Sequence, residues 1–126
     1  MNRSMWMGIV CAALCGTAFG ATSVVVDSGS RELAASENTS GYTFDIRDGA
    51  TLRLPATQGD FDIQFYMIAT NGTDTIDCSA VTGNVRFTNG VRARNASTLV
   101  VKGKDSVDVG CDVASVGYNY SALRST

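Results

Sequence analysis

The alternation that decides the fold class begins at residue 60 and reads DFDIQFYMIATNG as far as residue 72. Side chains along a strand point alternately to its two faces, so one face of this segment gathers Phe61, Ile63, Phe65 and Met67. That face is expected to enter the core. The dipeptide at residues 71–72, Asn-Gly, is typical of two-residue hairpin turns. The segment therefore predicts a long strand over residues 60–70 that leads into an antiparallel hairpin.

The same pattern of short alternating runs and turn dipeptides extends in both directions. Further Asp-Gly or Asn-Gly pairs stand at residues 48–49 and 89–90, and no sustained 3.6-residue period is present. This spacing predicts an all-β fold, a small antiparallel sandwich or barrel of about seven to nine short strands with hairpin connections. Two Thr-Asn-Gly units, at residues 70–72 and 88–90, are interpreted as hairpin chemistry and not as a sequence repeat.

The first twenty residues have the pattern of an export signal. Arg3 supplies a positive charge, residues 5–14 are wholly apolar, and Ala18 and Gly20 place small side chains before the expected cleavage point. An N-terminal membrane anchor is the alternative, but the apolar run is short for a bilayer and no second run follows. We therefore expect residues 1–20 to be a signal peptide, residues 21–40 a strand and connector, and residues 41–126 an all-β domain. No membrane span is expected after cleavage, and the location is secreted, either extracellular or periplasmic.

Cleavage after Gly20 would leave 106 residues and two of the four cysteines, Cys78 and Cys111. Exported proteins meet an oxidising compartment, so we expect a disulfide between these two. Closing the intervening loop would stabilise the fold by roughly 3–4 kcal/mol in the chain-entropy model. The alternative is a pair of buried free thiols.

Composition excludes several kinds of chemistry. The chain has no histidine, which rules out Ser-His-Asp and Cys-His catalysis and any His-ligated zinc or haem. Its net charge of −2 offers no basic face for nucleic acid. The aspartates have neither the calcium-loop spacing nor a paired arrangement for glycoside cleavage. We expect no enzyme activity, no catalytic residue, no metal and no cofactor.

Two kinds of surface residue are candidates for contacts. Tyr118 and Tyr120 alternate near the end of the chain and are candidates for ligand or subunit contact, with core packing as the alternative. Four Asn-x-Ser/Thr sequons predict exposed positions that a eukaryotic secretory pathway could glycosylate. They begin at Asn38, Asn71, Asn95 and Asn119.

The order of these pieces between about residues 42 and 120 resembles the small β domains of phage tail fibres and other virion surface fibres. The matching pieces are Leu54-Pro55, Gly59, Phe61 to Ile68, Asn71-Gly72, Thr75-Ile76, Gly83, Val107 to Val109 and Gly117-Tyr118. The resemblance implies a receptor-facing or structural module, commonly trimeric, without a fixed catalytic set. No functional residue is carried over from it. The signal peptide and the expected disulfide depart from the pattern of virion proteins assembled in a cytoplasm.

Together these features predict an exported, non-catalytic structural or adhesion module that associates with itself or with other fibre or surface subunits. An edge strand that must be covered or blunted gives a physical route to such assembly. One alternative is a monomeric module that binds a cell-surface glycan or protein through Tyr118 and Tyr120. Another is an inhibitor of an extracellular or periplasmic enzyme that inserts a hairpin tip such as residues 71–72 or 89–90.

Overall fold

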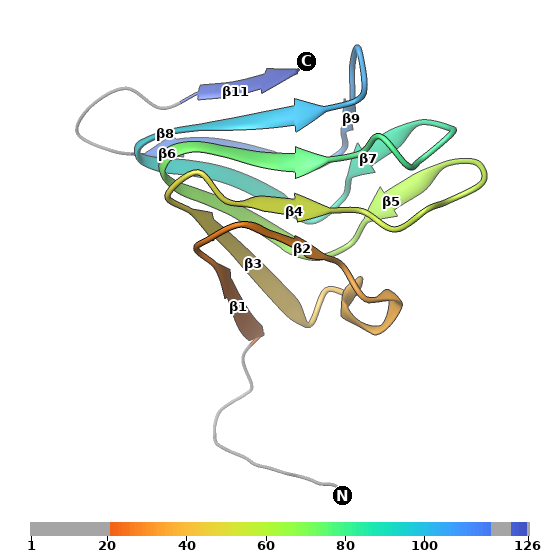
Figure 1. Ribbon diagram of the computed structural model, residues 1–126, viewed down its shortest axis with the longest axis horizontal. Coiled ribbons are helices and arrows are strands. Elements are labelled where there is room, and N and C mark those ends of the chain that lie inside the picture. Colours follow the sequence, from red (N-terminus) through yellow and green to blue (C-terminus); the bar gives the residue numbers. More distant parts are fainter. Residues whose placement is uncertain (1–20, 117–121, 126) are drawn as a thin grey trace, which may run out of the picture.

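The computed structural model describes residues 21–116 and 122–125, and it places residues 112–116 and 122–125 as backbone strands. The chain winds into a parallel β-solenoid of about 4 turns (Figure 1). The prediction of an all-β protein is confirmed. The prediction of an antiparallel sandwich or barrel with hairpin connections is wrong, because every strand pair in the described residues is parallel.

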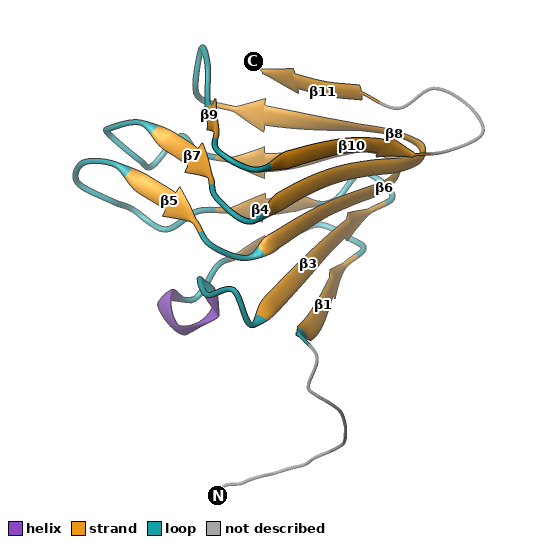
Figure 2. Ribbon diagram, turned by 180° about the vertical axis from the view of Figure 1, so that it is seen from behind, coloured by secondary structure: helices purple, strands orange, loops and turns teal. Residues whose placement is uncertain are grey.

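Each coil has up to three sides, and strands of successive coils stack side by side (Figures 1 and 2). The first side consists of β1 (Thr22–Val26), β3 (Tyr42–Arg47), the start of β6 (Tyr66–Asp77), the start of β8 (Gly90–Lys102) and β10 (Asp112–Val116). The second side consists of β2 (Ser30–Glu32), β4 (Thr51–Arg53), the ends of β6 and β8, and β11 (Ala122–Ser125). The third side consists of β5 (Phe61–Ile63), β7 (Val85–Phe87) and β9 (Asp108–Val109).

The register shows how much chain each coil uses. Phe44 pairs with Met67 and Met67 pairs with Val91, so partners on successive coils are 23 and 24 residues apart. A parallel pair needs a long return connection, which here is the remainder of the coil. The repeat therefore follows from the topology, although few stacked residues are identical.

The turn dipeptides explain why the hairpin prediction failed. Asp48-Gly49 and Asn71-Gly72 each place two consecutive residues at positive φ, between 54° and 83°. Two left-handed residues are what a type I′ hairpin needs, but here the chain continues into the next side of the same coil. The second Thr-Asn-Gly unit, residues 88–90, lies at another corner, where β8 begins at Gly90.

The predicted strand over residues 60–70 is also divided by a corner. β5 ends at Ile63 and β6 starts at Tyr66, while Ile63, Phe65 and Met67 are fully buried. The predicted inward face is thus correct for these residues, although the strand is broken between them. The sequence alternation continues through the corner because both sides of the corner line the same core.

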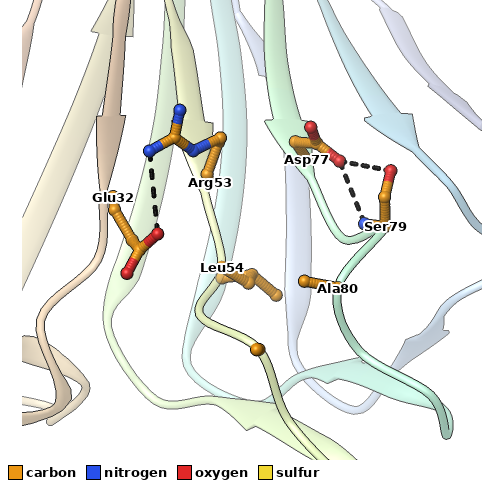
Figure 3. Close-up of a pocket in the computed structure, with 7 residues that line it drawn as sticks. Glu32, Arg53, Leu54, Asp77, Ser79 and Ala80 are labelled. Atoms are coloured by element: carbon orange, nitrogen blue, oxygen red, sulfur yellow. Dashed lines mark hydrogen bonds and ion pairs between the residues drawn. The ribbon is translucent and has the colours of Figure 1, made fainter.

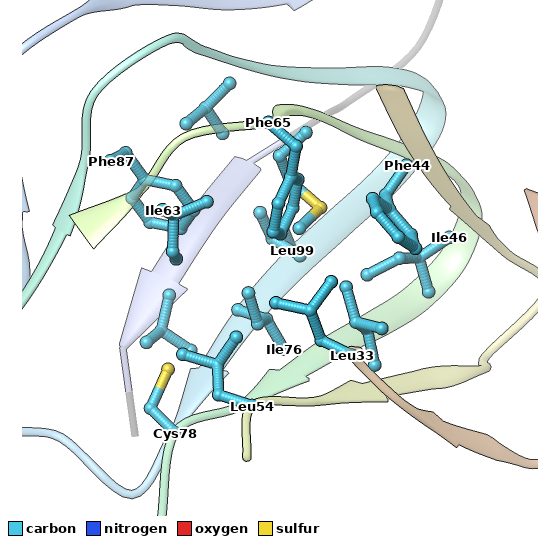
Figure 4. Packing of buried hydrophobic residues seen from close by; sticks show 14 of the residues in the cluster. Leu33, Phe44, Ile46, Leu54, Ile63, Phe65, Ile76, Cys78, Phe87 and Leu99 are labelled. Carbon is cyan, nitrogen blue, oxygen red and sulfur yellow. The ribbon is translucent and has the colours of Figure 1, made fainter. Parts of the chain in front are cut away.

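The core is a set of columns that run from coil to coil (Figure 4). One column stacks Leu52, Ile76 and Val101, and another stacks Ile63 on Phe87. Each apolar side chain thereby covers the one in the coil before it, and burial of this kind stabilises the fold by about 25 cal/mol per Å² of apolar area. Cohesion between coils comes from these columns together with the parallel hydrogen-bond ladders.

Candidate functional site

The N-terminal edge of the first side is formed by β1. Within the described residues β1 pairs with β3 on one side only, and its sequence, Thr-Ser-Val-Val-Val, has no charged side chain. Val25 is 47% exposed, which is high for a large apolar side chain. Edge strands are usually blunted by charges, prolines or bulges, and β1 has none of these in its five residues. This edge is suited to pairing with another strand.

The core beside β1 is closed by an ion pair. Arg31 belongs to the inward column that continues with Leu52, and its guanidinium lies 5.4 Å from the centre of the Phe44 ring. Arg31 Nη1 donates to Glu37 Oε1 at 2.9 Å, and this pairing lowers the pKa of Glu37 below its ordinary value. Glu37 ends the 3-10 helix Ala35–Glu37 and also accepts the Ala34 backbone N–H. The terminal coil thus covers the apolar core with a polar pair, as end repeats of solenoids do.

Charges alternate in sign along the outer surface of the second side. The strand register stacks Glu32, Arg53, Asp77 and Lys102 on successive coils, and Arg53 Nη2 lies 3.6 Å from a Glu32 oxygen. Opposite charges on neighbouring strands stabilise the pairing by a few tenths of a kcal/mol each.

A pocket of about 180 Å³ lies against this ladder (Figure 3). It is lined by Glu32, Arg53 and Asp77 together with Leu54, Ala56, Ser79 and Ala80. Burial alone would raise the pKa of Asp77. The hydrogen bonds from the hydroxyl and backbone N–H of Ser79, together with the nearby cations, outweigh this effect, and the pKa of Asp77 is lowered overall. The acids of the pocket are already paired, Glu32 with Arg53 and Asp77 with Ser79. These pairings are consistent with a structural role for the pocket.

The first side has a cluster of arginines on its outer surface. Asp45 accepts hydrogen bonds from Arg47 and Arg94, with Nη2 to Oδ2 distances of 2.8 and 3.1 Å. Thr70, which lies between the two arginines in the stack, donates its hydroxyl to Asp45 and accepts from Arg94 Nε. Asp45 is only 5% exposed, so one nearly buried carboxylate serves two guanidinium groups.

A third arginine, Arg92, lies in the same cluster and makes no ion pair with a described side chain. Its Nε is buried and has no hydrogen-bond partner among the described residues. Arg92 pairs in register with Ile68, and two residues before it Gly90 pairs with Tyr66. The Tyr66 ring fills the space over Gly90, where an added Cβ would lie 2.1 Å from a ring carbon. An aromatic ring and two arginines therefore follow one another along the outer surface of β8.

Asp74 is a carboxyl group inside the core. It is fully buried at the position stacked on Leu99, and its Oδ1 accepts the Gly49 N–H at 2.9 Å. Its Oδ2 has no partner among the described residues. Desolvation raises the pKa of Asp74 to about 7, so the neutral acid predominates in mildly acidic solution.

The predicted disulfide, glycosylation and contact residues lie partly inside and partly outside the described part of the chain. Cys78 is fully buried and Cys111 lies partly buried against the core, and the disulfide between them stays a prediction. Asn71 and Asn95 are exposed at successive corners, whereas both ends of the Asn38 amide are hydrogen-bonded to the backbone of Asp62 and Gln64. Tyr118, Tyr120 and Asn119 lie outside the described residues, and so does the predicted signal peptide at residues 1–20.

The arginine cluster is not recognisable in the sequence, because its members come from three coils. By themselves Arg92 and Arg94 indicate no more than a solvated basic segment, and Asp45, Arg47 and Thr70 stand at least 22 residues before them in the sequence. A search at a spacing of 23 or 24 residues would have aligned Arg47, Thr70 and Arg94.

The described residues contain no group of three or more Cys, Asp or Glu side chains placed to hold a metal ion. In the part of the chain that the structure describes, no helix has the length and apolar character needed to cross a membrane. Comparison of the chain with protein-family models, with curated proteins and with solved structures found no match. The fold itself defines the class of protein: a short parallel β-solenoid.

Proposed function

We propose that this chain is an exported, non-catalytic structural or adhesion module that assembles through the edge of β1. The observation that carries the proposal is the edge itself: five residues with no charge, paired on one side within the described residues, with Val25 47% exposed. Strand addition to such an edge is a common mode of protein assembly, in which backbone hydrogen bonds supply affinity.

Export is supported by the sequence of residues 1–20, in which an apolar run precedes the small residues Ala18 and Gly20. Cleavage after Gly20 would start the chain one residue before β1, which begins at Thr22. Removal of the leader would thus leave the β1 edge at the very start of the exported chain.

A structural role is also supported by the pairing of three acids, whereas the buried Asp74 keeps one oxygen without a partner among the described residues. Glu37 and Asp45 are engaged by arginines, and Asp77 is engaged by Ser79. The inhibitor alternative is less favoured, because residues 71–72 and 89–90 form corners of coils and not the tips of projecting hairpins.

The test begins with the protein purified from the compartment where it accumulates, with its intact mass showing whether residues 1–20 are removed. Sedimentation velocity over a range of concentrations is expected to show association of the wild type. A Val25→Lys substitution places a charge on the edge and should shift the protein to monomers. Gln58→Lys adds the same charge at an exposed loop position and should leave association unchanged.

A wild-type protein that stays monomeric at high concentration would overturn the proposal. So would equal dissociation by Val25→Lys and Gln58→Lys, because the effect would then be one of net charge. Circular dichroism of each variant checks that the strand content is retained.

A further inference from the structure

We infer that the outer surface of the first side binds an acidic polysaccharide, with Arg92 and Arg94 holding its anionic groups and Tyr66 packing against a sugar ring. The inference names a ligand class for the adhesion role and in that respect rests on the proposed function. The row of groups on β8 lies three strands from β1, about 14 Å at the usual spacing of parallel strands. Ligand binding and assembly can therefore be tested separately.

The alternation of β8 places the three groups in a row. Gly90, Arg92 and Arg94 are two residues apart, so all three face outward, about 6.6 Å from one to the next. The Tyr66 ring occupies the first position, above Gly90, because glycine leaves the room for it. The order along the strand is thus aromatic ring, guanidinium, guanidinium.

The charges of the cluster are not balanced among the described side chains. Arg47 and Arg94 share the single carboxylate of Asp45, and Arg92 makes no ion pair with a described side chain. Arg92 as a whole is only partly buried, so its outer guanidinium N–H groups, unlike the buried Nε, can reach a ligand. An anionic group in front of Arg92 and Arg94 would accept hydrogen bonds from both, and charge-assisted bonds to arginine are among the strongest.

Two observations favour a polysaccharide over another polyanion. The aromatic ring beside the arginines provides an apolar face for a sugar ring. Only one aromatic side chain is present on this surface among the described residues, too few for the successive base stacking typical of single-stranded nucleic acid. The chain as a whole has a net charge of −2, which opposes binding driven by a diffuse electrostatic field. Recognition must therefore come from the local row on β8.

The test measures binding of the full purified protein by titration calorimetry. The probes are a carboxylated oligosaccharide, oligogalacturonate, and a sulfated one derived from heparin, each beside its uncharged counterpart, the methyl ester or the desulfated chain. We expect at least one acidic probe to bind more tightly than its counterpart. Its binding should weaken as salt rises from about 0.05 M to about 0.3 M, because screening shortens the reach of the charges.

Substitutions then locate the site. Arg92→Gln is expected to weaken binding about tenfold, the loss of one charge-assisted bond, and Tyr66→Ala to weaken it severalfold. Arg86→Gln removes the same charge from the third side and should leave the affinity unchanged. Sedimentation of Arg92→Gln should match the wild type, which separates this surface from the β1 edge.

The inference is overturned if neither acidic probe binds better than its uncharged counterpart, or if Arg86→Gln weakens binding as much as Arg92→Gln. Equal affinity for a single-stranded oligonucleotide would also overturn it, as would equal affinity for inorganic sulfate or free galacturonate. In the last case the site would hold a single anion and not a sugar chain.

Discussion

Ala96 is the second residue of a left-handed corner pair, and the corresponding pairs of the two preceding coils end in glycine. The register shifts by one residue at this corner, so that Gly72 itself pairs with Ser97. The corner pairs Asp48-Gly49, Asn71-Gly72 and Asn95-Ala96 all have positive φ at both residues, and Ala96 has φ 57°. An L-residue with a Cβ is strained there by roughly 1–2 kcal/mol, whereas glycine is not. The third corner is therefore the strained one of the three.

Replacing Ala96 with glycine should relieve this strain. We expect Ala96→Gly to raise the free energy of unfolding by about 0.5–1 kcal/mol. The removal of strain stabilises the folded state, and the greater conformational entropy of glycine in the unfolded chain offsets part of this gain. Urea denaturation measures the change. Gly72→Ala is the reciprocal control and should lower stability by about 1 kcal/mol or more. An unchanged or lower stability of Ala96→Gly would contradict the corner geometry.

The buried carboxyl group of Asp74 should make the stability of the protein depend on pH. Its pKa is raised by burial to about 7 in the folded protein, against 3.8 for the ordinary group. Between these values the folded state binds the extra proton, so stability falls as pH rises from about 4 through about 7. Across this pH range the free energy of unfolding should fall by on the order of 2–4 kcal/mol.

The Asp74→Asn variant should remove this dependence. Asparagine keeps an oxygen to accept the Gly49 N–H but does not ionise. Urea denaturation at pH 4.5 and pH 8 is expected to show a smaller difference for the variant than for the wild type, with the variant the more stable at pH 8. Equal slopes for the two proteins would show that Asp74 is not the group responsible.

At the scale of the element, the two strands at the N-terminal end are protected unequally. β2 has Arg31 and Glu32 among its three residues, whereas β1 has no charge. Arg31 also closes the core with Glu37. Capping of this end therefore depends on the pair of Arg31 and Glu37.

Substituting Arg31 should open that cap. Arg31→Leu would extend the column of Leu52, Ile76 and Val101 to the end of the solenoid and leave Glu37 unpaired. We expect greater self-association at a given concentration, measured by light scattering, because an exposed apolar end promotes stacking. Arg53→Leu exposes the same side chain on the second side and should have a smaller effect. A monodisperse Arg31→Leu protein would argue against the capping role.

At this scale the sequence predicts which side chains face the core, but it does not predict the corners or the length of a coil. Alternation assigns Ile63, Phe65 and Met67 to the interior correctly, because alternate side chains of a strand face the core in any β fold. Asn71-Gly72 is ambiguous, since two left-handed residues serve a hairpin and a solenoid corner equally well. The stacked residues Phe44, Met67 and Val91 differ from one another, so a comparison of identities does not reveal the coil length. Only the pattern of inward positions and corner pairs repeats.

For the whole molecule, stability is expected to accumulate coil by coil. Each coil contacts its neighbours, so the free energy of a solenoid is close to a sum of coil and interface contributions. Residues 67–90 span one complete coil, because Met67 is in register with Val91. This segment is the natural unit for lengthening the protein.

Duplicating residues 67–90 in tandem should give a folded protein with one more coil. We expect a larger dependence of unfolding free energy on urea than in the wild type, because more surface is buried. The strand content per residue by circular dichroism should be unchanged. Inserting the same residues in scrambled order is the control and should give neither result. Loss of cooperative unfolding in the duplicated protein would contradict the independence of coils.

The charges stacked along the second side should help the coils to assemble in the correct order during folding. They alternate in sign through Glu32, Arg53, Asp77 and Lys102. Coils of nearly equal length and shape can stack on the wrong neighbour, a hazard of repetitive chains. If one coil were skipped, Glu32 would meet Asp77, or Arg53 would meet Lys102, and like charges would repel across adjacent strands. Correct order instead places opposite charges together at every step. The charges on the outer surface therefore favour the native order of the coils, by a few tenths of a kcal/mol at each step.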